Sequence, residues 1–417
     1  MRHIGLIPTR SAAPSSAGRA ARLLRPLASI LPLALVAAMG CREDAQSPTA
    51  PESEPALATT ATTALAFYQM SASIHSCGLT TANVAYCWGT NVEGGVGDGT
   101  TAERLTPVAV VGGLRFRQVS ATFFNTCGIT IDYRAYCWGS NFAGQLGDGT
   151  TTDRLTPVPV AGGLTFRQVT VGVSPHTCAV TYADRRVYCW GGNDYGELGD
   201  GTTTTRLAPV AVAGGRQFRV VSAGGYHTCG VTTLNEAFCW GSNRDGQIGD
   251  SSTAILRRRP TRVAGGRLFR QLSAGWQHTC GVTTEDRGYC WGNGRDGQVG
   301  DGKTYLRFWP KAVAGGLSFD RVSAGFQHTC GETTTNRAYC WGENFGGALG
   351  DGTETARLTP VAVAGGLTFS QVSAGAGNTC AVTPAGVGYC WGSNIYGRLG
   401  DGTTTDRLTP TPVAGPS

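Results

Sequence analysis

From residue 64 to the C-terminus, short apolar and β-branched segments alternate with clusters of Gly, Asn, Asp and Thr. One stretch contains four such segments: Leu317–Gly325, Gln327–Cys330, Ala338–Gly342 and Leu358–Val363. Segments of this length and composition predict β-strands, and no window carries a convincing apolar period of 3.6 residues. We therefore expect units of four strands, called A to D, and no long helix.

The tripeptide Cys-Trp-Gly shows that these units repeat. It begins, at steps of 50 to 52 residues, at Cys87, Cys137, Cys189, Cys239, Cys290, Cys340 and Cys390. A four-stranded unit of about 50 residues has the size of a propeller blade. An open solenoid would need atypical capping repeats, but the first and seventh units are nearly as regular as the others. The sequence therefore predicts an all-β, seven-bladed β-propeller of four-stranded antiparallel blades over residues 64–417.

The repeat also resembles a known family. Its pattern is Ser-Ala-Gly-x-x-His-Thr followed by Tyr-x-Trp-Gly-x-Asn-x-x-Gly-x-Leu-Gly-Asp-Gly-Thr, which is similar to the repeat of the regulator of chromosome condensation, a family of seven-bladed propellers. Kelch propellers share the period, but their glycine pair and tyrosine-tryptophan spacing fit less well. This chain departs from the family pattern because each unit has a cysteine in each of two neighbouring strands.

Fourteen of the fifteen cysteines form seven such pairs. In a hairpin of strands B and C, directly opposed residues approach disulfide distance. The predicted disulfides are Cys77–Cys87, Cys127–Cys137, Cys178–Cys189, Cys229–Cys239, Cys280–Cys290, Cys330–Cys340 and Cys380–Cys390. The third pair is separated by one extra residue, which lies in the turn at Tyr182–Arg186. So many cysteines are typical of a chain that folds in an oxidising compartment.

Zinc is the alternative reading of these cysteines, because His75, His176, His227, His278 and His328 each lie two residues before one. Repeats two and seven have Asn125 and Asn378 at that position and still keep both cysteines. The close Cys-x2-4-Cys spacing of zinc sites is absent. We therefore expect these histidines to hydrogen-bond loop backbone, with no metal.

The N-terminus has the pattern of an export signal. Residues 1–40 contain five arginines, no acid, and an apolar run from Leu27 to Met39, which at about 13 residues is too short for a permanent transmembrane helix. Ala38–Cys41 resembles a bacterial lipoprotein box and predicts lipidation of Cys41; ordinary cleavage nearby is the alternative. Residues 41–63 read as a flexible tether. The expected location is the cell envelope, as a lipoprotein, or the extracellular space.

Removal of the signal changes the charge of the chain from +6 to +1, since 29 basic and 28 acidic residues remain. A near-neutral chain offers no phosphate-tracking surface at the level of net charge, so a nucleic acid partner is not expected. Contact with a membrane is expected only through the lipid anchor, and the propeller is expected to be monomeric.

Two further motifs look chemical. Gly297–Thr304 matches the P-loop expression GxxxxGK[ST], but it falls in the repeat's own Gly-Asp-Gly loop and not between a strand and a helix. The seven loop aspartates each precede an arginine by six or seven residues, which favours a structural ion pair over a calcium loop. No Gly-x-Ser-x-Gly or His-Glu-x-x-His motif occurs. We expect no catalytic residue, no cofactor and no metal.

Function is expected where the blades differ. The A-to-B and C-to-D loops must emerge on one face, and the B-to-C turns on the other. The first face offers a set of aromatic and polar residues typical of a protein-binding hot spot: Phe123, Phe124, Tyr195, Tyr226, Arg244, Trp276, Gln277, Phe326 and Tyr396. The competing interpretation is that several of these rings fill loops or plug the central channel.

The sequence thus favours a non-catalytic exported module that binds a protein or peptide. The arrangement resembles secreted bacterial members of the family that inhibit β-lactamases. Two alternatives stay open: a propeller enzyme or carbohydrate-binding protein, and guanine-nucleotide exchange on a small GTPase, which the family's name implies. The signal, the paired cysteines and the near-neutral charge disfavour the exchange factor.

Overall fold

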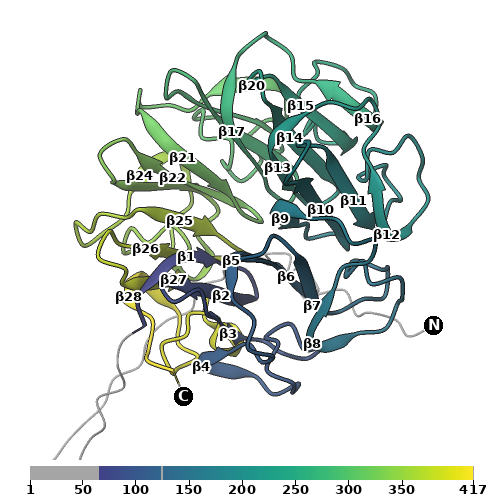
Figure 1. Ribbon diagram of the computed structural model, residues 1–417. Helices are drawn as coiled ribbons and strands as arrows, with labels where there is room; N and C mark the ends of the chain where they lie inside the picture. The colour runs from purple at the N-terminus through teal and green to yellow at the C-terminus, as the bar shows by residue number, and fades with distance from the viewer. Residues whose placement is uncertain (1–64, 124, 417) are drawn as a thin grey trace, which may run out of the picture. The chain divides into compact units, whose positions relative to one another are not determined.

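The computed structural model describes residues 65–123 and 125–416, which form seven four-stranded antiparallel sheets arranged around a central channel (Figure 1). Each sheet consists of four consecutive strands, so blade 1 is β1–β4 and blade 7 is β25–β28. The predicted seven-bladed propeller is confirmed. The sequence does not show whether the ring closes through a blade that mixes strands from both ends of the propeller. In the structure all seven blades are self-contained.

The A strands are innermost and line the channel: β1 (Phe67–Ser71), β5 (Phe116–Ala121), β9 (Phe166–Val171), β13 (Phe218–Ala223), β17 (Phe269–Ala274), β21 (Phe319–Ala324) and β25 (Gln371–Ala374). The B strands follow: β2 (His75–Thr80), β6 (Asn125–Thr130), β10 (His176–Thr181), β14 (His227–Thr232), β18 (His278–Thr283), β22 (His328–Thr333) and β26 (Asn378–Val382).

The C strands carry the Cys-Trp-Gly tripeptide: β3 (Ala85–Gly89), β7 (Ala135–Gly139), β11 (Val187–Gly191), β15 (Ala237–Ser242), β19 (Gly288–Gly292), β23 (Ala338–Gly342) and β27 (Gly388–Gly392). The outer D strands are β4 (Arg104–Ala109), β8 (Arg154–Pro159), β12 (Arg206–Ala211), β16 (Leu256–Arg262), β20 (Arg307–Ala312), β24 (Arg357–Ala362) and β28 (Arg407–Pro412). Two short 3-10 turns, η1 (Phe345–Gly347) and η2 (Ile395–Gly397), lie in C-to-D loops.

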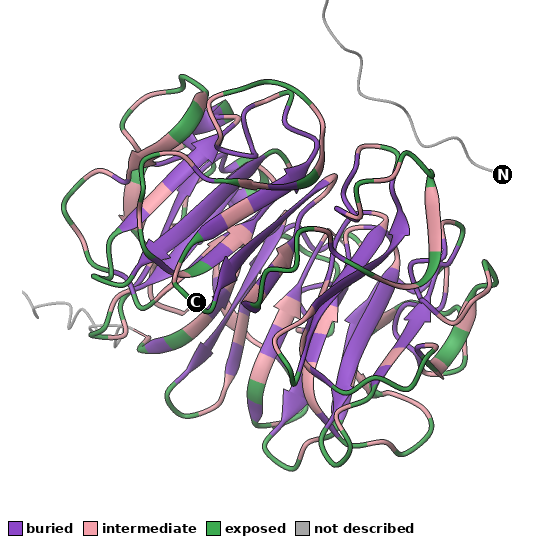
Figure 2. Cartoon of the chain, turned by 90° about the horizontal axis from the view of Figure 1, so that it is seen from above, coloured by how far each residue is buried: buried purple, intermediate pink, exposed green. Residues whose placement is uncertain are grey.

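Burial follows this order of strands. The B and C strands are almost entirely buried, whereas the D strands are mostly intermediate or exposed (Figure 2). The A strands alternate, because their apolar side chains enter the core and the intervening polar side chains face the channel. The core therefore lies between neighbouring blades.

All fourteen paired cysteines form disulfides within their own blades, as predicted. The two cysteines of each pair are directly opposed in the B–C register, with Cα atoms 4.0–4.1 Å apart. In blade 3 the extra residue is absorbed by the turn, so that Cys178 still opposes Cys189. Seven intrablade disulfides are typical of an oxidising, extracytoplasmic compartment.

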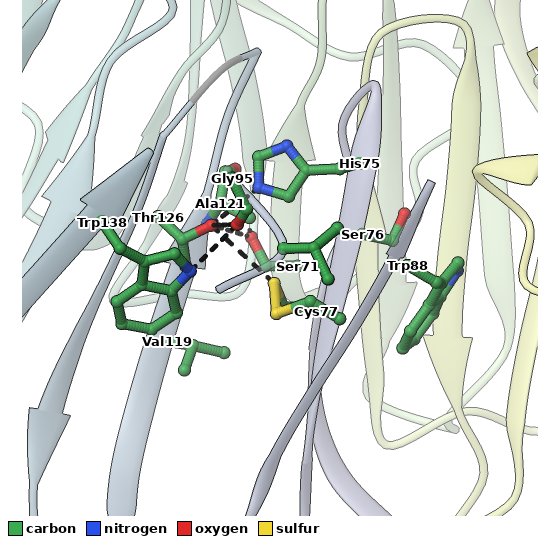
Figure 3. Close-up of a disulfide and its surroundings, with 12 residues drawn as sticks. Ser71, His75, Ser76, Cys77, Trp88, Gly95, Val119, Ala121, Thr126 and Trp138 are labelled. Atoms are coloured by element: carbon green, nitrogen blue, oxygen red, sulfur yellow. Dashed lines mark hydrogen bonds between the residues drawn. A yellow bond between two sulfur atoms is a disulfide. The ribbon is translucent and has the colours of Figure 1, made fainter. Parts of the chain in front are cut away.

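A single backbone carbonyl anchors each seam between blades. In the seam of blades 1 and 2, the carbonyl of Gly95 accepts hydrogen bonds from Trp138 Nε1 and from Thr126 Oγ1, both at 2.9 Å (Figure 3). The seven tryptophans of the Cys-Trp-Gly tripeptides are fully buried and make this contact, at 2.8–3.1 Å. The last seam uses the same contact, since Trp88 and Ser76 of blade 1 donate to the carbonyl of Arg398 in blade 7.

The repeat histidines extend this contact. His75 Nε2 lies 2.7 Å from Thr126 Oγ1, and the other four histidines lie 2.8–3.0 Å from the equivalent threonine of the next blade. Because the single threonine proton is already donated to the carbonyl, the histidine Nε2–H must be the donor. The expected structural role is thus correct. The partner of Nε2 is a side-chain hydroxyl of the next blade, and backbone hydrogen bonds with Phe123 and Ser174 also act on His75 and His176.

Two further rings of hydrogen bonds join the A strands. Seven hydroxyls each accept the backbone N–H of the next blade at 2.9–3.2 Å, from Ser71, Ser120, Thr170, Ser222, Ser273, Ser323 and Ser373. Five glutamine amides bridge both the N–H and the C=O of one residue in the next blade. In the closing seam, Gln371 bridges the N–H and C=O of Met70 at 2.6 and 2.7 Å. Blade 4 has Val220 at the glutamine position, and blade 6 has Arg321.

The closing amide gives a stability prediction. We expect Gln371→Val, which imports the residue of blade 4, to lower the free energy of unfolding by about 1–2 kcal/mol, because both groups of Met70 lose their partner. The reverse exchange, Val220→Gln, supplies an amide between β13 and β17 and is expected to raise stability by about 0.5–1 kcal/mol. Urea unfolding with disulfides intact measures both. Equal stability of all three proteins would contradict the role of the amide.

The histidines predict sensitivity to acid. Burial lowers the pKa of His227 and of His278 to about 3, and the pKa of His75, His176 and His328 to about 4. Since the unfolded histidine titrates near pH 6.5, the unfolded chain binds more protons between these values. Stability is therefore full above pH 6.5 and falls with pH below it, by up to about 1.4 kcal/mol per pH unit for each histidine.

The chain supplies its own matched variants for this test, because blades 2 and 7 carry asparagine at the same position. Replacement of His227 and His278 by asparagine should make unfolding free energy less dependent on pH between 6.5 and 4.5, whatever its value at pH 7. The reverse change, Asn125→His, should steepen the dependence. Urea titrations at pH 7, 6 and 5 decide this, and identical slopes in the three proteins would show that the histidines are not the acid-sensitive groups.

Candidate functional site

The A-to-B and C-to-D loops emerge on one face, as expected from the antiparallel order. Each C-to-D loop is long and needs internal support. In blade 2, Asn141 Nδ2 donates to the carbonyls of Thr150 and Thr152, and its Oδ1 accepts the N–H of Leu146. The asparagine therefore fixes both ends of the loop.

The predicted aspartate–arginine pair closes each of these loops. The pairs are Asp98–Arg104, Asp148–Arg154, Asp200–Arg206, Asp250–Arg257, Asp301–Arg307, Asp351–Arg357 and Asp401–Arg407, with shortest N–O distances of 2.6–2.9 Å. Burial alone would raise the pKa of Asp98, but hydrogen bonds from Thr100 and Arg104 hold it below its ordinary value. Rigid loops of this kind can present side chains in fixed positions.

On this face, side chains from blades 2 to 6 form a continuous chain of ring contacts. Phe123 of blade 2 lies 5.9 Å from Phe326 of blade 6, measured between ring centroids. Phe326 stacks on Trp276 of blade 5 at 4.9 Å, and Trp276 contacts Tyr226 of blade 4 at the same distance. The A-to-B loops supply these four rings.

The chain continues outward onto the C-to-D loops. Tyr226 meets the edge of Tyr195 of blade 3 at 4.9 Å, and the guanidinium of Arg244 lies 5.2 Å from the Tyr195 ring. Arg244 is exposed, whereas the five rings are half-buried. We call this set the aromatic surface: Phe123, Phe326, Trp276, Tyr226, Tyr195 and Arg244.

The aromatic surface lies over the channel mouth. Phe123 and Phe326 line a cavity of about 120 Å³ whose other walls are the ends of the A strands and small residues of the A-to-B loops. These two rings therefore plug the channel, which was one of the two interpretations of the sequence. Trp276, Tyr226 and Tyr195 do not line this cavity. These three rings therefore remain candidates for the other interpretation, a protein-binding surface.

A second hollow adjoins the aromatic surface at Phe326. It has a volume of about 150 Å³ and is lined by Gln327, Glu343, Phe345, Ala376 and neighbouring residues of blades 6 and 7. Phe345 is 64% exposed. Its position on η1 accounts for this exposure. The hollow combines the apolar walls of Phe345 and Ala376 with the carboxylate of Glu343, and this combination suits a side chain of a bound polypeptide.

Two of the predicted residues that the structure describes, Gln277 and Tyr396, lie outside the aromatic surface. Gln277 accepts a hydrogen bond from Asn293 Nδ2 at 3.0 Å, so its amide supports the neighbouring C-to-D loop. Tyr396 lies on η2 of blade 7, 48% exposed and with a φ of 63°, and it contacts none of the rings above. Phe124 and Cys41 lie outside the residues that the structure describes.

One carboxyl group beneath the aromatic surface has an unusual pKa. Burial raises the pKa of Glu197 to about 7. Its Oε2 accepts the N–H of Tyr195 at 2.8 Å, and Ser174 Oγ lies 3.4 Å from its Oε1. Gln145, Gln247 and Gln298 make the same backbone contact in their own loops. Glu197 therefore performs the loop-bracing role of these neutral amides.

The described residues contain no cluster of three or more potential metal ligands from His, Cys, Asp and Glu. The segment Gly297–Thr304 lies in the loop between β19 and β20 and opens no helix, because β20 follows it directly. Within residues 65–123 and 125–416, no helix is both long and apolar enough to cross a membrane.

Comparison with known proteins identifies the repeat. The sequence matches the model of the "Regulator of chromosome condensation (RCC1) repeat" over residues 133–180, 184–231, 235–282, 336–382 and 386–417, which together exceed half of the chain. The chain belongs to this family. A second model of the same repeat matches residues 116–145, 166–197, 218–247, 269–298 and 319–347.

Among curated proteins, the chain is similar to the ultraviolet-B receptor UVR8 of Arabidopsis thaliana. The two are 32% identical over 130 residues, and this match covers 30% of the chain and 29% of the receptor. The shared part is therefore less than a third of either protein.

Solved structures with the same fold include human WBSCR16, with a TM-score of 0.72 and 20% identity over 80% of this chain and 94% of that one. Prp20p of Saccharomyces cerevisiae, described with its binding to Gsp1p and histones, has a TM-score of 0.67 and 21% identity, covering 74% and 80%. The ectodomain of the Arabidopsis thaliana receptor kinase ACR4 has a TM-score of 0.51 and 21% identity, covering 79% and 97%. At these identities the likeness concerns the fold alone.

Glu197 gives a prediction of pH dependence opposite in sign to that of the histidines. Because its folded pKa is raised, the stability it contributes is lost as the pH rises through 7. We expect Glu197→Gln to be more stable than the natural chain by about 1–3 kcal/mol at pH 8, with little difference at pH 5. The reverse variant Gln247→Glu should lose stability at pH 8. Urea unfolding at both pH values is the measurement, and a gain from Glu197→Gln that is equal at pH 5 and pH 8 would rule out titration of Glu197.

Proposed function

We propose that this protein is an exported, non-catalytic interaction module that binds a protein or peptide through the aromatic surface. The observation that carries the proposal is the unbroken contact of five half-buried rings and Arg244 across four A-to-B loops and two C-to-D loops. Tyr, Trp and Arg are the residues enriched at binding hot spots, and rings fixed by their neighbours lose little conformational entropy on binding.

Several features support a macromolecular partner over a small substrate. The cavity at the channel mouth is only about 120 Å³ and the hollow beside Phe326 about 150 Å³, below the usual size of small-molecule sites. Glu197, whose pKa burial raises beneath the aromatic surface, has its oxygens engaged in the loop. A rigid aromatic surface with shallow pockets fits side chains of a polypeptide.

Export and anchoring form the second part of the proposal. Seven disulfides suit an oxidising compartment, and the N-terminal sequence pattern suits lipidation at Cys41, which would hold the ring at the cell envelope on the tether of residues 41–63. Rings of this fold occur in ectodomains of plant receptor kinases. We further propose that the module is monomeric and binds neither nucleic acid nor a cofactor.

Partner capture tests the aromatic surface. After crosslinking in intact cells identifies the captured polypeptide, its affinity for the purified chain is measured directly. We expect Trp276→Ala and Tyr226→Ala each to weaken binding at least about 30-fold, the loss typical of a hot-spot residue. Phe142→Ala is the matched control, because Phe142 is an exposed ring on blade 2 outside the aromatic surface.

Unchanged affinity of both aromatic variants would exclude this surface as the binding site. Saturable binding of an oligosaccharide, lost in the same two variants, would instead favour a carbohydrate-binding protein, since aromatic rings also stack on sugars.

A further inference from the structure

The face opposite the aromatic surface has its own irregularity, in blade 3. The turn between β10 and β11 carries one residue more than the others, within the sequence Tyr182-Ala183-Asp184-Arg185-Arg186. The turn contacts blade 2, where the rings of Tyr182 and Tyr133 lie 4.0 Å apart. A departure from the repeat that is not needed for the fold is a candidate for function.

Residues of the two turns and of two A strands line a hollow of about 490 Å³. Its lining consists of Arg117, Tyr133, Arg167, Tyr182, Ala183 and Arg185. Arg117 and Arg167 occupy the same position of β5 and β9, directly after the buried phenylalanine, and Arg185 comes from the long turn. The hollow is therefore lined by three guanidinium groups and no carboxylate.

Several other arginines on the same face are paired with carboxylates. Arg134 pairs with Asp132, Arg186 with Asp184, and Arg270 with Asp286 and Asp320. Within the described part of the chain, Arg117, Arg167 and Arg185 form no ion pair. The Arg117 guanidinium instead lies 4.3 Å from the centroid of the Tyr133 ring. Three cations that share one hollow repel one another unless an anion lies between them.

The position of Arg219 shows what the neighbouring blades do with an equivalent arginine. Arg219 donates to the carbonyl of Arg270, and Arg270 donates to the carbonyl of Phe319. Both side chains thus brace the next blade. Arg117 and Arg167 occupy the same strand position but do not brace the next blade in this way. The Arg117 guanidinium contacts Tyr133 instead, so both cations line the hollow, where an anion can reach them.

We propose that the hollow lined by Arg117, Arg167, Arg185, Tyr133 and Tyr182 is a binding site for a phosphate group. Three guanidinium groups match the two negative charges of a phosphate better than the single charge of a carboxylate, and their planar forks suit its oxygens. The two tyrosine hydroxyls can add further donors. A volume of about 490 Å³ exceeds that of a bare phosphate ion, so the phosphate can carry a substituent.

Two sources can supply this chemistry: a soluble phosphate compound or the headgroup of an anionic lipid. The lipid source rests on the anchoring proposed above. The described chain begins on this face, because Phe67 of β1 pairs with Thr80 at the end of β2, beside the turn. Tyr68 donates to the carbonyl of Phe116, the residue before Arg117.

The test uses the full mature chain with Cys41→Ser, so that a lipid anchor cannot cause vesicle binding. Inorganic phosphate binding is measured by calorimetry, and vesicle binding by flotation with phosphatidylglycerol in phosphatidylcholine, against pure phosphatidylcholine. The site variant is Arg117→Ser, Arg167→Ser and Arg185→Asn together, which imports residues found at these positions in blades 7 and 1. Asparagine also tolerates the φ of 57° at residue 185.

The control variant removes the same charge from the same face outside the hollow: Arg115→Gln, Arg287→Gln and Arg337→Gln. We expect the site variant to weaken binding at least about 10-fold and the control variant to change it less than about 2-fold at equal ionic strength. If inorganic phosphate binds, a soluble phosphate compound is sufficient as the ligand. If only the anionic vesicles bind, the ligand is the lipid headgroup.

Binding in either arm supports the site if the site variant weakens it. Absence of binding in both arms overturns the proposal, and so does an equal loss in the control variant, which would reduce the effect to net charge. Partner affinity through the aromatic surface is measured on the same variants. Because that surface lies on the opposite face, its failure and the failure of the phosphate site are distinguishable.

Discussion

The ring depends on one backbone carbonyl in each seam. This oxygen accepts both the indole N–H and the threonine or serine hydroxyl of the next blade. Both donors are fully buried, so leaving either unpaired would cost roughly 1–3 kcal/mol. Because the acceptor belongs to the backbone, the side chain at that residue is free to vary, and the seven residues are Gly95, Gln145, Glu197, Gln247, Gln298, Ala348 and Arg398.

The seam also explains why glycine recurs two residues after this carbonyl. A Cβ added at Gly97 would lie 2.5 Å from Trp138 Nε1, and Gly97 has a φ of 77°. The indole therefore needs both the space and the backbone conformation that only glycine provides here. The two kinds of contact therefore act at different levels. The seams determine the packing between blades, and the disulfides fix strands B and C within each blade.

Much of this could be predicted from the sequence. The spacing of Cys-Trp-Gly predicted the number of blades, and the ten-residue separation of the cysteines predicted their pairing, because both depend on local register. The partner of the histidines could not be predicted, since Thr126 is 51 residues from His75 and the bond appears only when blades are adjacent. The same limit applies to the aromatic surface. Sequence predicted which loops share a face, but not that Phe123 and Phe326 would meet across the channel.

The phosphate-binding hollow shows the limit most clearly. The extra residue in the blade 3 turn was visible in the sequence, as was each arginine. The arginines come together only when blades 2 and 3 are adjacent in the ring, because the hollow is lined by the starts of two A strands and by two B-to-C turns. A departure from the repeat can thus be detected in the sequence, whereas the site to which it contributes can be recognised only in the three-dimensional structure.

The self-contained blades have a consequence for the topology of the chain. Since the seam of blades 7 and 1 uses the same carbonyl and hydroxyl contacts as the other six, the ring has no structurally privileged starting point. A short connection could join β28 to β1, and the chain could be opened in a loop that connects strand D to the next strand A without dividing a sheet. A circular permutant would keep every disulfide within one blade. Such a rearrangement would relocate the tether around the ring while both faces kept their side chains.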